Sequence, residues 1–145
     1  MPCEETGGRP FALLLLAAIY LCSLLLAVSG YGDPFPFMGR FYLAEAGGRL
    51  VFADSMICLY LVIGILKRQR LTAWLMVGYN LLDIANACVN LAVIPPKLYA
   101  QLAGTPVPGD ELRLNTIVAA LVLMLLNIYV FANRRHFNNR SPYLF

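Results

Sequence analysis

The sequence predicts an all-α integral membrane protein, a bundle of four transmembrane helices formed by a single domain over residues 1–145. Three observations lead to this prediction. Hydrophobic residues make up 60% of the chain and charged residues only 13%, against roughly 25% charged residues in soluble domains. The mean hydropathy is +0.69. The charges are also spaced so that four long apolar segments lie between them. This composition disfavours a soluble enzyme, a nucleic-acid-binding domain and a disordered tail.

The four apolar segments cover residues 11–29, 50–66, 72–94 and 114–133. Their only charged residues are Asp54 and Asp83. Because a helix rises ~1.5 Å per residue, about 20 residues cross a ~30 Å hydrocarbon layer, and each segment is long enough. A helix also satisfies every backbone amide within lipid. The first segment ends in small residues like a signal peptide, but its apolar run exceeds the roughly 7–15 residues of such peptides, so we expect a span.

Lysine and arginine are unevenly distributed between the two sides of this arrangement. Seven lie in the N-terminal tail, the connector after the second span and the C-terminal tail, and four lie in the loops 30–49 and 95–113. The excess marks the cytoplasmic side, so both termini are expected there. Basic residues at helix ends contact the lipid bilayer, and we expect no nucleic-acid partner. The two long loops, rich in proline, glycine and aromatic residues, favour an interfacial cap over the bundle, with a ligand-binding lid as the alternative.

The chain offers few residues for catalysis or metal binding. Its four cysteines, at positions 3, 22, 58 and 88, include no Cys-x-x-Cys pair, and we interpret the three within spans as small apolar residues. The single histidine, His136, lies beyond the last span, which leaves haem and zinc without a ligand set. Neither a Gly-x-Ser-x-Gly motif nor a phosphate-binding glycine loop occurs. We therefore expect no catalytic residues, no metal and no cofactor.

The third span carries a polar stripe within about 120° of one helical face. The stripe comprises Tyr79, Asn80, Asp83, Asn86 and Asn90. Asp83 lies close to the middle of the span, where an aspartate costs ~2.5–3.5 kcal/mol on insertion scales and needs a partner or a proton. The stripe must therefore face protein or water.

The second span adds another carboxylate to this stripe. Asp54 is expected roughly 6 Å to the external side of the middle of its own helix, facing Asn86 and Asn90. Two neighbouring buried carboxylates cannot both ionise cheaply, so at least one is expected to hold a proton at neutral pH. Asn127 and Tyr129 on the fourth span are further polar candidates.

Two functions are consistent with the stripe, and a third is weaker. The first is a non-catalytic accessory or structural subunit, in which the stripe joins helices of this chain, of other membrane subunits or of a homo-oligomer. The alternative is a small proton- or ion-coupled transporter or channel-forming oligomer, with Asp83 as the titrating group and Asp54 as its outer relay. Transport sites often lie where glycine or proline interrupts a helix, and neither residue interrupts the third span near Asp83. A membrane enzyme acting on lipid or quinone would have only these two aspartates as bases.

Short motifs resemble the YdgK-like family of bacterial four-span inner-membrane proteins. They are the pair Gly7-Gly8, the basic run 67–71 leading into Ala73-Trp74-Leu75, and the last-span ending 127–131 followed by Asn133-Arg134-Arg135. The chain departs from the family pattern at Asn127-Ile128, where the family has proline, and in lacking a tryptophan after the glycine pair. The resemblance implies a four-span fold in the bacterial inner membrane. It does not suggest an activity, because the family has none that is known.

Overall fold

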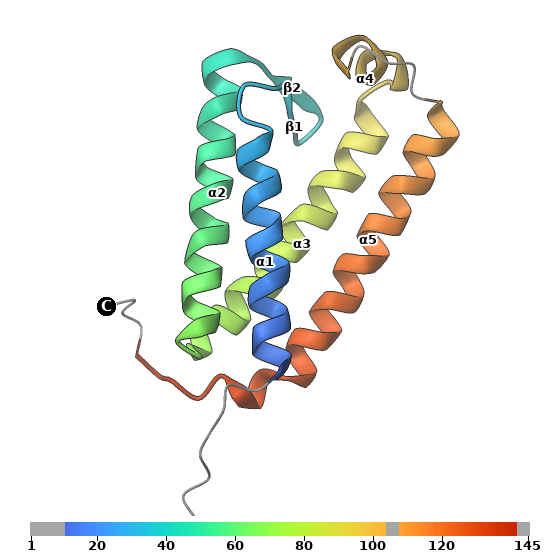
Figure 1. Ribbon diagram of the computed structural model, residues 1–145. Coiled ribbons are helices and arrows are strands. Elements are labelled where there is room, and N and C mark those ends of the chain that lie inside the picture. Colours follow the sequence, from blue (N-terminus) through green and yellow to red (C-terminus); the bar gives the residue numbers. More distant parts are fainter. Residues whose placement is uncertain (1–10, 104–107, 142–145) are drawn as a thin grey trace, which may run out of the picture.

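The computed structural model describes residues 11–103 and 108–141 and contains four long helices (Figure 1). They are α1 (Phe11–Ser29), α2 (Ala44–Leu66), α3 (Arg70–Val93) and α5 (Gly109–Ala132). All four are long and apolar enough to cross a membrane, as the sequence predicts.

Two of the helices begin five or more residues earlier than the apolar segments predict. α2 starts six residues sooner, and its first turns hold an ion pair between Arg49 and Glu45. α5 starts five residues sooner, with Asp110 and Glu111 in its first turn. Acidic side chains suit the positive end of a helix dipole, and charged pairs four residues apart support a helix in water. The spacing of charged residues located the apolar part of each helix, but it did not predict the polar turns that extend α2 and α5.

The two long loops contain regular structure that the sequence analysis did not predict. The first holds an antiparallel hairpin of β1 (Phe35–Phe37) and β2 (Arg40–Tyr42). Met38 and Gly39 at its tip have φ of 46° and 83°, as a tight two-residue turn requires. The second loop holds the short helix α4 (Pro96–Ala103), and a 3₁₀ turn, Arg134–His136, follows α5.

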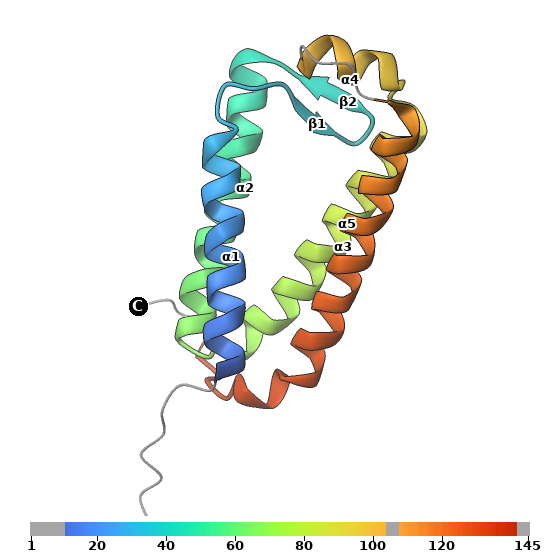
Figure 2. The ribbon, with the colours of Figure 1, turned by 45° about the vertical axis from the view of Figure 1, so that its right-hand side comes forward.

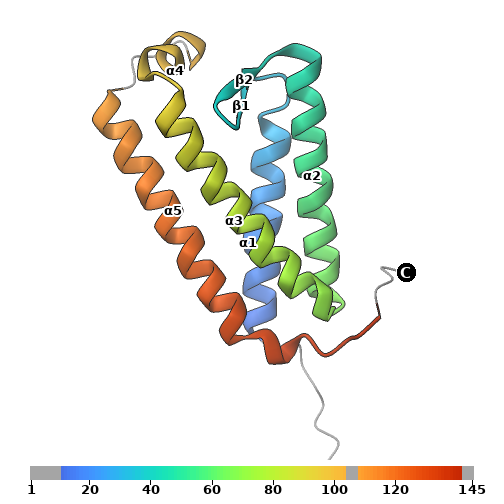
Figure 3. The same ribbon diagram turned by 180° about the vertical axis from the view of Figure 1, so that it is seen from behind.

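The helices form two antiparallel pairs, one of α1 with α2 and the other of α3 with α5. The pairs meet at one end and separate toward the end that carries the β-hairpin and α4 (Figures 1 and 2). α1 begins and α5 ends at the closed end (Figure 1). Viewed from behind, α3 leaves α2 soon after the turn that joins them (Figure 3). α2 and α3 are therefore close only near this turn.

The buried core lies where the two pairs meet. Tyr20 of α1, Ile65 of α2, Met76 of α3 and Val130 of α5 are almost fully buried in one cluster, together with Phe137 of the C-terminal tail. Many large apolar side chains on the outer helix faces are exposed. Lipid solvates such faces as well as protein does, so a small core is sufficient for a bundle in a bilayer.

A close contact between Gly64 and Thr72 fixes the α2–α3 turn. A side chain at Gly64 would collide with Thr72, whose Cβ would lie 2.9 Å from the added carbon. Arg68 takes the left-handed conformation in the connector, with φ of 55°, and Gln69 beside it is fully buried. The glycine therefore lets the start of α3 press against the end of α2.

We expect Gly64→Ala to lower the free energy of unfolding by ~1–3 kcal/mol, because the added methyl overpacks this contact. Gly78→Ala is the matched control, since Gly78 is also within a helix but has open space beside it. Thermal unfolding in detergent compares the two. Equal melting temperatures for the two variants would show that the contact does not constrain the turn.

Candidate functional site

The polar stripe of α3, Tyr79 to Asn90, crosses the interior of the bundle and meets a different element at each level. Near the closed end it contacts α1, α2 and α5. Near the open end it contacts the β-hairpin. Four of its five members make hydrogen bonds to other parts of this chain.

Asn80 joins three helices at the closed end. Its side-chain oxygen accepts a hydrogen bond of 2.9 Å from the Tyr20 hydroxyl of α1. Its side-chain nitrogen donates one of 2.8 Å to the Asn127 oxygen of α5. All three residues are buried. The Asn127 nitrogen is buried without a partner in the described part of the chain. This chain of hydrogen bonds ties α1 and α5 to the same residue of α3.

Tyr79 links α3 to α2. Its hydroxyl donates to Asp54 at 2.7 Å, and the Cys58 sulfur lies 3.3 Å from the same hydroxyl oxygen. Because the tyrosine proton points to the carboxylate, the Cys58 thiol is the donor of the second contact. Asp54 lies next to the central residue of α2. The bond to Tyr79 gives this carboxylate a partner within the span.

Asn86 and Asn90 bind the β-hairpin. Their oxygens accept hydrogen bonds from the backbone nitrogens of Met38 and Gly39, at 2.8 and 2.7 Å. Their nitrogens donate to the Pro36 carbonyl at 3.3 and 3.1 Å. The turn of the hairpin is thus held by two amide side chains one helical turn apart.

These bonds correct the expected position of Asp54. The prediction that Asp54 faces Asn86 and Asn90 is wrong, because it assumed that α2 and α3 run together along their whole length and that α2 begins at residue 50. With α2 starting at Ala44, Asp54 lies at the middle of its helix and meets Tyr79. Further outward α3 separates from α2, and the hairpin occupies the place opposite Asn86 and Asn90.

Asp83 differs from the rest of the stripe because it makes no hydrogen bond or ion pair within residues 11–103 and 108–141. It is half-buried and lies one turn outward from Tyr79, and the carboxylate of Asp54 acts on it electrostatically. The apolar segments, residues 11–29, 50–66, 72–94 and 114–133, contain no lysine, arginine or histidine that could offset these charges. Asp83 is therefore a carboxylate near mid-span that the described fold leaves without a partner.

The remaining predicted residues have packing roles. Asn127 belongs to the Asn80 chain, and Tyr129 is partly buried against the core. Cys58 is buried, whereas Cys22 and Cys88 are exposed. Cys3 lies outside the described residues. Sequence reasoning missed Tyr20 and the hairpin as partners of the stripe. Tyr20 is the longest polar side chain in an otherwise apolar first span, and that isolation was the available signal.

The arrangement limits the chemistry available to the described residues. None of them form a group of three or more histidine, cysteine or carboxylate side chains that could hold a metal ion. The two carboxylates, the Tyr79 hydroxyl and the Cys58 thiol can hold and pass protons. Outside the spans, Tyr99 packs edge-on against Phe41 at 5.0 Å, and its burial raises the pKa of its hydroxyl.

No protein-family model matches this chain, and neither a curated protein nor a solved structure gives a significant match. The resemblance to the YdgK-like family stays a prediction.

We expect the double variant Asn86→Ala and Asn90→Ala to release the hairpin while the bundle stays folded. The backbone amides of Met38 and Gly39 would lose their acceptors, so their hydrogen exchange should become faster on the order of tenfold or more. Exchange mass spectrometry of the hairpin measures this effect. Asn138→Ala, an exposed asparagine in the tail after α5, should leave the exchange unchanged. Unchanged exchange in the double variant would contradict the docking.

Proposed function

We propose that the protein is a non-catalytic, multi-span protein of the bacterial inner membrane with both termini in the cytoplasm. The structure supports this orientation through the position of its basic residues. The α2–α3 turn, with Arg68 and Arg70, contacts the tail that contains Arg140, so these charges gather at one end of the bundle. A concentration of lysine and arginine at one end is typical of the cytoplasmic side.

We further propose that Asp83 binds a proton or a small cation, with Asp54 and Tyr79 as its neighbours. One observation carries this proposal: Asp83 is the one stripe residue without a hydrogen bond in the described chain. The amides of the stripe and Tyr79 are used in holding elements of the fold together. Ionisable residues within membrane spans are rare and costly, and they usually mark proton or ion pathways.

The charge balance supports a positive ligand. If Asp83 and Asp54 were both ionised, they would repel each other, and the apolar segments 50–66 and 72–94 that hold them contain no lysine or arginine. A proton or a cation between them removes this repulsion, and the Tyr79 hydroxyl already stabilises the Asp54 charge by donating a hydrogen bond. Asp83 would then take up and release the ligand while Asp54 stays bonded.

The hairpin provides a means of access control for this site. Asn86 and Asn90, which hold it, are one and two turns outward from Asp83 on the same face. The helix pairs are separated at this end (Figure 2). Release of the hairpin would open the outer end of the stripe, whereas docking would cover it.

Reconstituted vesicles test the proposal. We expect the wild-type protein to carry protons or small cations into vesicles under a potassium diffusion potential, followed with an internal pH dye and with an ion-sensitive dye. Asp83→Asn keeps the shape of the side chain but removes the titrating group, so flux should fall to the background of empty vesicles. Asp110→Asn, an exposed carboxylate at the start of α5, should retain full flux.

A wild-type protein without flux, or an Asp83→Asn variant that matches the wild type, would contradict the proposed binding role. Retained folding of the variant is checked by size-exclusion chromatography in the same detergent. This control separates a lost site from a lost structure.

The second candidate is an accessory subunit of a membrane assembly, and a groove between α2 and α3 favours it. The groove has a volume of about 540 Å³ and is lined mainly by apolar side chains, with Gly78 open toward it. Small residues of this kind let a partner helix approach closely in lipid. Purification from native membranes in mild detergent distinguishes the candidates. A stoichiometric foreign subunit that Gly78→Leu releases would favour the subunit role, and a protein that purifies alone would favour transport.

A further inference from the structure

The C-terminal tail is fixed to the turn between α2 and α3. The Asn139 carbonyl accepts a hydrogen bond of 2.8 Å from the Arg70 nitrogen, and the Asn139 nitrogen donates one of 3.0 Å to the Arg68 carbonyl. The Asn139 side chain donates a third to the Lys67 carbonyl at 3.2 Å. Phe137, just before this bridge, is buried in the core. The tail therefore runs across the closed end of the bundle along a defined path.

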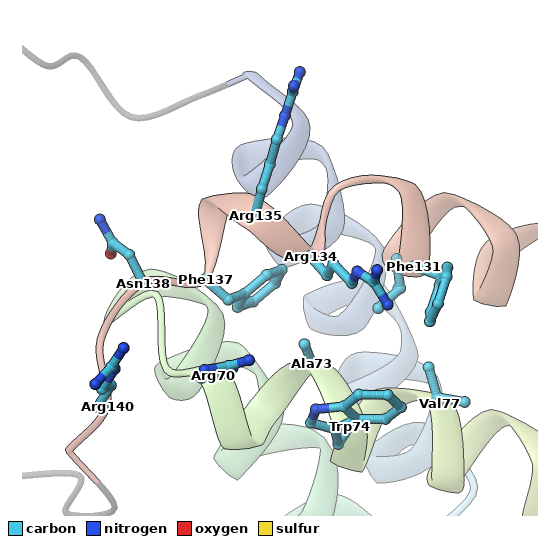
Figure 4. Close-up of a pocket in the computed structure, with 11 residues that line it drawn as sticks. Arg70, Ala73, Trp74, Val77, Phe131, Arg134, Arg135, Phe137, Asn138 and Arg140 are labelled. Carbon is cyan, nitrogen blue, oxygen red and sulfur yellow. The ribbon is translucent and has the colours of Figure 1, made fainter.

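This path encloses a pocket between the start of α3, the end of α5 and the tail. Its volume is about 500 Å³, within the range of small-molecule sites. Four arginines line it, at positions 70, 134, 135 and 140. Figure 4 shows Arg134 lying beside Phe131 and Arg70 pointing into the space beneath it, whereas Arg135 points away from both. The Arg134 guanidinium carbon is 4.0 Å from the centre of the Phe131 ring.

The charge of this pocket is not compensated by the described residues. Its lining contains no carboxylate, and none of its four arginines forms an ion pair within the described chain. Arginine presents a planar fork of donors that matches phosphate oxygens, and stacking on an aromatic ring holds that fork in place. Arg134 and Arg70 thus form a pair of positive groups ready for an anion.

The other wall of the pocket is apolar. Trp74 and Phe131 pack edge-on with ring centres 6.4 Å apart, and both are about half exposed, at 57% and 50%. Val77 lies one turn further along α3, toward the middle of the span. The pocket therefore joins a basic end at the bundle surface to aromatic and aliphatic side chains that continue into the span.

We propose that this pocket binds one anionic phospholipid, with the phosphate between Arg70 and Arg134 and an acyl chain along Trp74 and Val77. The two halves of the pocket match the two halves of such a lipid. A soluble phosphate would use only the arginines and would leave the exposed rings without a role. This site is independent of Asp83, which lies on a different level of α3.

Trp74 is the only tryptophan of the chain, so its fluorescence reports on this one side chain, which lines the pocket on one side and the groove between α2 and α3 on the other. The full chain is reconstituted in two series of phosphatidylcholine vesicles, one with increasing mole fractions of brominated phosphatidylglycerol and the other with the same mole fractions of brominated phosphatidylcholine. Bromine on an acyl chain quenches a tryptophan that it approaches. We expect the anionic lipid to quench Trp74 at lower mole fractions than the neutral lipid does. Equal quenching by the two lipids would overturn the proposal, and this comparison needs no variant.

Two double variants then identify the residues that cause the preference for the anionic lipid. The double variant Arg70→Gln and Arg134→Gln should reduce the preference for the anionic lipid by about fivefold for each arginine removed. Arg40→Gln with Arg113→Gln, which removes the same charge from residues outside the pocket, should leave it unchanged. An equal loss in both double variants would mean that net charge, and not the pocket, attracts the lipid. Inorganic phosphate is added against sodium chloride of the same ionic strength. If phosphate abolishes the preference and sodium chloride does not, phosphate oxygens without an acyl chain are enough for the site, and the assignment of an acyl chain to Trp74 and Val77 is wrong.

Discussion

The fold depends on one constraint, that a helix inside lipid must find partners for its own polar side chains. α3 carries amide, phenol and carboxyl groups along one face, and a lipid bilayer would offer no water to satisfy them. Tyr20 and Asn127 approach from α1 and α5 and bond to Asn80. Asp54 approaches from α2 and bonds to Tyr79. The neighbours of α3 are therefore positioned by polar contacts, while their apolar outer faces are left to the lipid.

The same constraint accounts for the shape of the molecule. Near the closed end the partners of α3 are side chains of other helices, so the helices must be close. Near the open end the partners are backbone groups of the hairpin, which are bound by Asn86 and Asn90. An inserted hairpin requires space, and the two helix pairs separate there (Figure 2). Asp83 lies between these two regions and receives a hydrogen-bond partner from neither in the described chain, which is why we propose it as the ligand-binding residue.

The sequence predicted the four spans and the stripe, because charge spacing and helical periodicity are local properties. It did not predict the hairpin at residues 35–42, whose tip takes left-handed backbone angles at Met38 as well as at Gly39. Nor did it predict that Asp54 meets Tyr79, because that pairing depends on the angle between α2 and α3. The polar extensions of α2 and α5 were missed because they lie beyond the apolar windows. The choice of partners along the stripe is a property of the packed bundle, and no local pattern contains it.

The most direct test of this account compares the thermal stability of two leucine variants of the stripe in detergent. Asn80→Leu removes a residue that two helices depend on, so its melting temperature should fall well below that of the wild type. Asp83→Leu removes a carboxylate without a hydrogen-bond partner in the described chain, so its melting temperature should equal or exceed the wild-type value. A stable Asn80→Leu protein beside an unfolded Asp83→Leu protein would contradict the division between structural and functional residues.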